Sequence, residues 1–154
     1  MLAGLVPMAA QPYLDEDGGN LFYTGTVEDF IVPIGITSIS FDVRGGAGGS
    51  ALTTGGAGCS APGGEGAIAS AVFTVGNGPQ DIPPCSTIRF VVGEAGASMN
   101  SLTIVGIGTS VGGGGGGSAV LFRPPGSSEF SILLVAGGGG GAYQGVFAGV
   151  CVDN

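Results

Sequence analysis

The chain has 154 residues with a hydrophobic fraction of 44%, and only 9% of its residues are charged. Disordered chains combine low hydrophobicity with high charge, so this composition favours one folded domain. Lys and Arg together number three against eleven acids, giving a net charge of −8. Because phosphate neutralisation dominates nucleic-acid affinity, we expect no nucleic-acid partner. No apolar run approaches the roughly 20 residues that span a bilayer, so we expect no membrane span.

Residues 1–27 are predicted to form an N-terminal extension ahead of a domain at residues 28–154. The stretch "QPYLDEDGGNLFYTG" at residues 11–25 is polar and rich in turn-forming residues. A free sheet edge can accept a strand from another chain, so we expect aromatic residues here to contact a neighbouring subunit. Covering the domain's own core is an equally good role. These residues are Tyr13, Phe22 and Tyr23, together with Phe30 just after the extension.

Short segments of alternating hydrophobicity recur along residues 28–154 and predict β-strands. In the first, Ile39, Phe41 and Val43 alternate with small polar or acidic residues, and similar patterns lie at residues 68–75 and 88–92. The stretch "RPPGSSE" joins two further apolar segments and predicts a hairpin. No segment has a helical period over ten residues free of Gly and Pro. The predicted fold class is all-β, with short antiparallel strands combined with packed polyglycine helices and with little or no α-helix.

Glycine runs lie directly against these predicted strands. A flexible linker is the default interpretation, but linkers join domains, whereas these runs interleave the strands of one domain. Two runs match the dinucleotide pattern G-x-G-x-x-G/A, yet no helix pattern follows either one. We expect extended polyglycine with three residues per turn, whose N–H and C=O groups bond neighbouring glycine segments. The structural glycines are Gly45, Gly46, Gly48, Gly49, Gly112, Gly113, Gly114, Gly115, Gly116, Gly117, Gly137, Gly138, Gly139, Gly140 and Gly141.

Five stretches carry a resemblance to a known class of domains. They are "DFIVPIGITSISFDVRGGAGG" (29–49), "GGEGAIASAVFTV" (63–75), "IRFVVGEAG" (88–96), "GGGGGGSAVLF" (112–122) and "LLVAGGGGGAY" (133–143). In this order they resemble the extracellular glycine-rich domains, which include the glycine-rich region of anaplastic lymphoma kinase-type receptors, bacterial surface proteins and phage tail-fibre adhesins. The resemblance implies packed polyglycine-II helices beside β-strands, an extracellular or virion-surface location, and no catalysis.

The three cysteines do not form a CxxC motif, and the chain has no histidine to complete a zinc site. For an extracellular chain we expect one disulfide and one free thiol. Three buried thiols are the alternative. We expect the disulfide to join Cys85, which precedes a predicted strand, to Cys151, which ends one.

The residue types needed for catalysis are scarce. Without histidine the chain cannot build a Ser-His-Asp or Cys-His arrangement. Paired acids occur at residues 15–17 and at Glu28 and Asp29. They are sequence neighbours in turn-like segments, which favours a solvated surface over a glycosidase pair or a calcium loop. We therefore expect no enzymatic activity, no bound metal and no cofactor.

Each of the three arginines, Arg44, Arg89 and Arg123, lies close to a predicted strand. An ion pair with an acid such as Asp42 or Glu94 is the simpler expectation, and a ligand-binding arginine is the alternative. Two function classes remain. One is a structural subunit that forms a homo-oligomer or filament, and the other is an adhesin that binds a surface glycan or protein through exposed loops. A mean hydropathy of +0.53 favours the first, because so apolar a chain should expose apolar surface.

Overall fold

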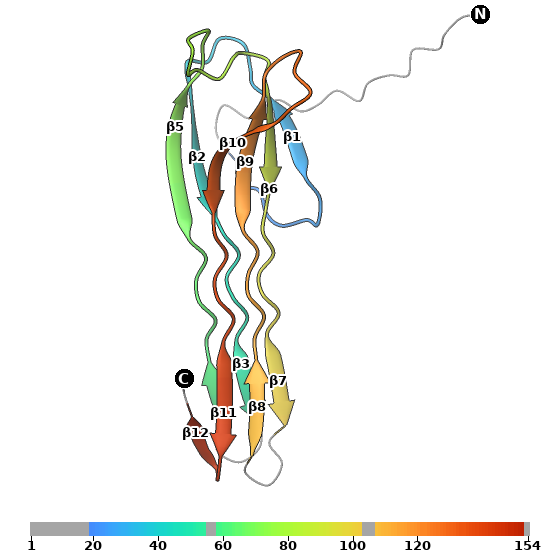
Figure 1. Ribbon diagram of the computed structural model, residues 1–154, viewed down its shortest axis with the longest axis vertical. Coiled ribbons are helices and arrows are strands. Elements are labelled where there is room, and N and C mark those ends of the chain that lie inside the picture. Colours follow the sequence, from blue (N-terminus) through green and yellow to red (C-terminus); the bar gives the residue numbers. More distant parts are fainter. Residues whose placement is uncertain (1–18, 55–57, 103–106, 153–154) are drawn as a thin grey trace, which may run out of the picture.

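A computed structural model describes residues 19–54, 58–102 and 107–152. Within these ranges the protein is all-β, about 48% strand and without helix, which confirms the all-β part of the predicted fold class. The described residues therefore include no helix of the length and apolarity that a membrane crossing requires. Figure 1 shows a long, narrow molecule with strands gathered at two ends and extended segments crossing between them. We call these the upper end and the lower end, in the orientation of Figure 1.

Each end collects strands from distant parts of the sequence. The upper end holds β1 (Glu28–Ile31), β2 (Ser38–Arg44), β5 (Ile68–Thr74), β6 (Thr87–Val91), β9 (Ser118–Arg123) and β10 (Ser131–Ala136). The lower end holds β3 (Ala51–Thr54), β4 (Cys59–Ala61), β7 (Met99–Leu102), β8 (Gly108–Val111), β11 (Tyr143–Phe147) and β12 (Val150–Val152). The connections between the ends, which we call the shaft segments, are residues 45–50, 62–67, 92–98, 112–117 and 137–142.

The upper end is a sandwich of two antiparallel sheets, with strand orders β1-β6-β9-β10 and β2-β5. The predicted alternation in β2 is confirmed, because Phe41 and Val43 are buried while Asp42 between them is exposed. The two apolar side chains belong to one core with Ile88 and Val120 of the larger sheet, which are essentially inaccessible. Burial of these side chains holds the upper end together.

Strands β9 and β10 form the predicted hairpin. They pair antiparallel, with Ser118 opposite Ala136 and Phe122 opposite Ser131. The register shifts between Ile132 and Leu134, which marks a bulge in the edge strand β10. Bulges are common at sheet edges, where they interrupt a regular pairing surface.

The lower end consists of two three-stranded sheets with orders β12-β11-β8 and β4-β3-β7. Strands β3 and β7 pair in parallel, with Ala51 opposite Met99, which departs from the expectation of antiparallel strands. The reason is that both strands enter the lower end from shaft segments that run downward (Figure 1). The interior between the sheets is small and partly polar, since Thr53 and Gln144 are both fully buried.

The cysteine count was interpreted correctly, but the predicted pairing was wrong. Cys59 of β4 is bonded to Cys151 of β12, with the Cα atoms 5.7 Å apart, and Cys85 is the exposed free cysteine. Cys85 lies just before β6 at the upper end, whereas Cys151 lies at the lower end, so the length of the shaft separates them (Figure 1). The disulfide joins the two sheets of the lower end through one strand of each.

Candidate functional site

The shaft segments are joined by backbone hydrogen bonds that repeat every third residue. Segment 45–50 donates from Gly46 to Gly116 O at 2.8 Å and from Gly49 to Gly113 O at 2.7 Å. It lies at the centre of the shaft, because it shares such bonds with all four other segments. The remaining backbone bonds that this segment donates are Gly45 N to Ala67 O and Gly48 N to Gly64 O. It accepts bonds from Gly96, Gly139 and Ala142 of the shaft and from Met99 of β7.

Many shaft glycines leave no room for a side chain. A Cβ atom built on Gly46 would lie 2.1 Å from the carbonyl oxygen of Glu94, and one on Gly48 would lie 1.9 Å from that of Gly140. Ala47, between them, is exposed. The central segment "GGAGGS" therefore needs glycine at two of every three positions, because two of its three sides face another backbone.

The glycine requirement in the shaft arises from this close approach. The described glycines with positive φ are Gly25, Gly35, Gly58, Gly126 and Gly149, and all of them lie outside the shaft segments. The shaft backbone is therefore conformationally open to other L-residues. Some shaft positions that face solvent carry a side chain, as at Ala47, Glu65 and Ser98, while others, such as Gly114, remain glycine.

The lower end presents an apolar face without charge. In the sheet β12-β11-β8, Val111 lies opposite Tyr143, and Phe147 lies opposite Val150, so these side chains share one face. All four are exposed, with Phe147 at 68% and Val150 at 65%. The six strands of the lower end contain no Asp, Glu, Lys or Arg. Apolar surface gathered in this way is typical of an interaction site.

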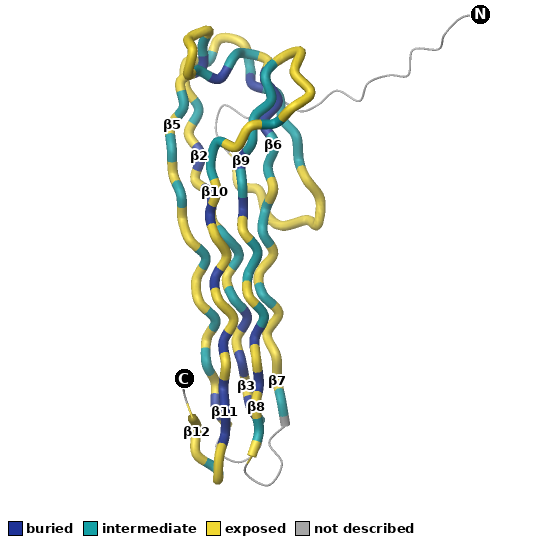
Figure 2. The backbone as a smooth tube through the Cα atoms, in the orientation of Figure 1, coloured by how far each residue is buried: buried dark blue, intermediate teal, exposed yellow. Residues whose placement is uncertain are grey.

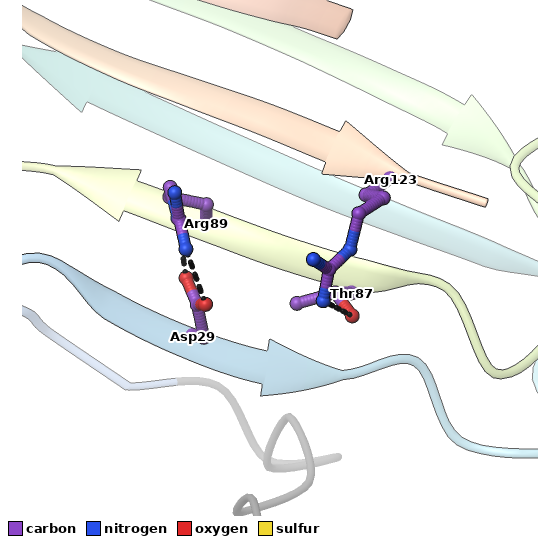
Figure 3. Close-up of polar contacts among 4 residues, drawn as sticks. All are labelled: Asp29, Thr87, Arg89 and Arg123. Carbon is purple, nitrogen blue, oxygen red and sulfur yellow. Dashed lines mark hydrogen bonds and ion pairs between the residues drawn. The ribbon is translucent and has the colours of Figure 1, made fainter. Parts of the chain in front are cut away.

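The upper end carries a cluster of charged side chains on the outer face of the larger sheet (Figure 3). Arg89 of β6 donates from Nε and Nη2 to the two carboxylate oxygens of Asp29 on β1, both at 2.7 Å. This hydrogen-bonded ion pair lowers the pKa of Asp29 from its ordinary value. Arg123 of β9 donates weakly to Thr87 Oγ1 at 3.4 Å. The Phe130 ring lies 4.0 Å from the Arg89 guanidinium and 4.8 Å from that of Arg123.

The arginine partners differ from those expected. In the described part of the chain Asp29 is the partner in the arginine ion pair, and neither Asp42 nor Glu94 forms one. Asp42 instead accepts a hydrogen bond from Ser70 on the neighbouring strand β5. Sequence neighbours cannot reveal this pairing, because Asp29 and Arg89 are 60 positions apart and meet only through the β1–β6 register.

A groove of about 1070 Å³ with a mixed polar and apolar lining lies beside β2, lined by Phe30, Phe90 and residues 38–44. Val75 N donates a hydrogen bond to Thr37 O, and Gly45 N donates one to Ala67 O. The odd-numbered residues of β2 therefore direct their backbone N–H and C=O groups toward β5. The even-numbered residues of β2 direct their backbone groups toward the free edge. Residues 19–22 also line this groove.

The predicted intersubunit aromatics are divided among several places. Tyr13 lies outside the described residues. Phe30 packs edge-on against Phe90 of its own chain, with ring centroids 5.6 Å apart. Phe22 and Tyr23 are exposed, and the neighbouring Glu94 carboxylate raises the pKa of Tyr23. The structure therefore gives Phe30 a role in its own domain.

The acids at residues 15–17 also lie outside the described residues, while Glu28 and Asp29 are adjacent in β1. Within the described ranges, no three His, Cys, Asp or Glu side chains are grouped as a metal site would require. Comparison with known proteins found no matching family model, no similar curated protein and no similar solved structure.

Proposed function

We propose that this chain is a non-catalytic extracellular structural protein that self-associates into a fibre or surface layer. The observation that carries this proposal is the exposed, charge-free face of β8, β11 and β12 at the lower end. Among the described residues, the charged side chains belong to the upper end and the shaft segments and none belongs to a lower strand, so the described surface is polarised. In this proposal a second copy of the same chain covers the lower face.

The shaft supplies the rigid spacer in this proposal. Its hydrogen bonds repeat every third residue and reach several neighbours, whereas a β-strand repeats every second residue and bonds two. A threefold repeat is the property of the polyproline-II conformation, which has no internal hydrogen bonds. We therefore interpret the shaft segments as a bundle of polyglycine-II helices. Such a bundle would hold the two ends at a fixed separation.

Apolar burial would outweigh the repulsion between two acidic copies. Covering a few hundred Å² at about 25 cal/mol/Å² contributes roughly 5–10 kcal/mol before the entropic cost of association is subtracted. The net charge of −8 opposes contact, but physiological salt screens it beyond about 8 Å. The charged upper end would also lie far from a contact made at the lower end (Figure 1).

The test compares two substitutions that add the same charge at similarly exposed sites. Phe147 of β11 is 68% exposed on the lower face, and Val72 of β5 is 73% exposed on the upper end. The wild-type chain should associate at micromolar concentration in light scattering, Phe147→Glu should be monomeric, and Val72→Glu should associate like wild type. A wild-type chain that stays monomeric at high micromolar concentration overturns the proposal.

An adhesin that recognises a surface ligand is the second candidate function. The arginine cluster around Phe130 favours it, because that cluster concentrates positive charge in an acidic protein. The segment from Pro125 to Glu129, which precedes Phe130, is exposed at the tip of the upper end (Figure 2).

A further inference from the structure

Two of the chain's cations lie on one face of one sheet. Lys and Arg together number three, and Arg89 and Arg123 both project from the outer face of the β6–β9 pair (Figure 3). Asp29 is the acid that pairs with this cluster. The cluster therefore has a local charge of about +1 in a chain whose net charge is −8. A purely structural salt bridge would need one arginine, which leaves the second to be explained.

Asp29 pairs with Arg89 and fixes the position of its guanidinium. Both carboxylate oxygens accept from Arg89, and the Phe130 ring packs on the same guanidinium. Bidentate pairing and stacking on an aromatic ring hold a guanidinium in a defined plane. Arg89 is thus a fixed positive charge, with its Nη1 group directed away from the pair.

Arg123 has the unused hydrogen-bonding capacity. Its contact with Thr87 Oγ1 at 3.4 Å is long, and among the described residues it forms no ion pair. A guanidinium carries five N–H donors in a planar fork that matches a carboxylate. Phe130 contacts this guanidinium by a cation–π interaction, which reduces the conformational freedom that the side chain loses on binding.

The surroundings of the cluster combine charge with apolar surface. On the same sheet face, Leu121 lies opposite Arg89 and next to Ile132 on β10. Ile132 is 67% exposed. A ligand that presents a carboxylate on a ring with apolar C–H groups would satisfy both features, whereas a bare inorganic anion would use only the arginines.

We propose that Arg123, supported by Arg89, Asp29 and Phe130, binds the carboxylate of an acidic sugar on a surface glycan. The Arg123 fork would donate hydrogen bonds to the carboxylate oxygens, and the sugar ring would lie toward Leu121 and Ile132. This inference rests on the adhesin candidate and is independent of self-association through the lower face. The two proposals concern opposite ends of the molecule and can fail separately.

The test titrates the full chain with glucuronate and N-acetylneuraminate and follows the backbone amide signals of β6 and β9 by NMR. Wild type should bind at least one of the two sugar acids, and Arg123→Gln should weaken that binding roughly tenfold or more. Arg123→Lys retains the charge without the fork and should fall between them. Arg44→Gln, on the outer face of β2, is the matched control and should bind like wild type.

Three results overturn the proposal. One is the absence of binding to either sugar acid by wild type at millimolar concentration. Another is equal binding of the neutral methyl ester, which would show that the carboxylate is not recognised. The last is equal binding of inorganic sulfate, which would reduce the cluster to a nonspecific anion site. Unchanged amide signals elsewhere in Arg123→Gln establish that the variant is folded, so that loss of binding reports on the site.

Discussion

A Cβ atom built on Gly115 would lie 2.0 Å from the carbonyl oxygen of Gly46, which belongs to a different shaft segment. The same residue donates its N–H to Gly139 O at 2.8 Å, so it contacts two neighbouring segments at once. Its sequence neighbour Gly114 is exposed, and a Cβ there would lie 3.6 Å from Gly139 O, an ordinary contact distance. Two glycines of one uniform run therefore have opposite steric requirements.

We predict that Gly115→Ala lowers the free energy of unfolding by about 1–3 kcal/mol, because the methyl group forces two backbones apart. Gly114→Ala should leave stability unchanged or raise it by about 0.4–1 kcal/mol, since alanine has fewer conformations to lose from the unfolded chain. Chemical denaturation of the two variants measures the difference. Equal effects of the two substitutions would contradict a packed shaft and indicate a loose loop.

The sequence alone could predict the strands of the upper end, because their apolar residues alternate. The pattern of Phe41 and Val43 identifies β2, and the turn residues after Arg123 identify the hairpin of β9 and β10. Both elements can therefore be recognised from their own local sequence. The abutting of glycine runs against strands was equally visible in the sequence.

The lower end was harder to predict because its strands carry little local signal. Strands β3 and β4, with the sequences "ALTT" and "CSA", lie inside a low-complexity block and read as loop. Their formation depends on pairing with β7 and on packing against β11, contacts that no local pattern encodes. The Cys59–Cys151 bond, spanning 92 positions, follows from this packing and was missed for the same reason.

The disulfide should stabilise the lower end by reducing the conformational entropy of the unfolded chain. Closing a loop of this length is worth about 2–5 kcal/mol in the usual entropic treatment. We predict that the double variant Cys59→Ser with Cys151→Ser loses about that much stability in thermal or chemical unfolding. Cys85→Ser should have little effect, because this cysteine is exposed and unpaired. A larger loss for Cys85→Ser would contradict the observed pairing.

The Asp29–Arg89 pair should make stability depend on pH in the acidic range. The folded-state pKa of Asp29 lies below the ordinary value of 3.8, so its stabilising contribution is present above that value and is lost as the pH falls through the folded pKa. We predict that Asp29→Asn lowers stability by roughly 1 kcal/mol at neutral pH. The difference from wild type should shrink as the pH falls below about 4. A difference that is constant down to pH 2 would contradict the pairing, and urea denaturation at stepped pH values measures it.

Hydrogen exchange in residues 112–117 should show a period of three. The amides of Gly112, Gly113, Gly115 and Gly116 donate to Ala142 O, Ala97 O, Gly139 O and Glu94 O, respectively. Gly114 and Gly117 are exposed and donate no backbone bond to another described residue.

We therefore predict slow exchange at two successive glycines followed by fast exchange at the third, measured on assigned amide signals by NMR. A flexible linker would exchange rapidly throughout, because none of its amides is bonded. A regular β-strand would alternate with a period of two if only one of its edges were paired. The predicted pattern of two protected positions and one open position requires that each turn of the segment bond two different neighbours.

Segment 45–50 offers an internal repeat of the measurement, since Gly45, Gly46, Gly48 and Gly49 donate such bonds whereas Ala47 is exposed. Uniform exchange in both segments would remove the physical basis for a rigid shaft.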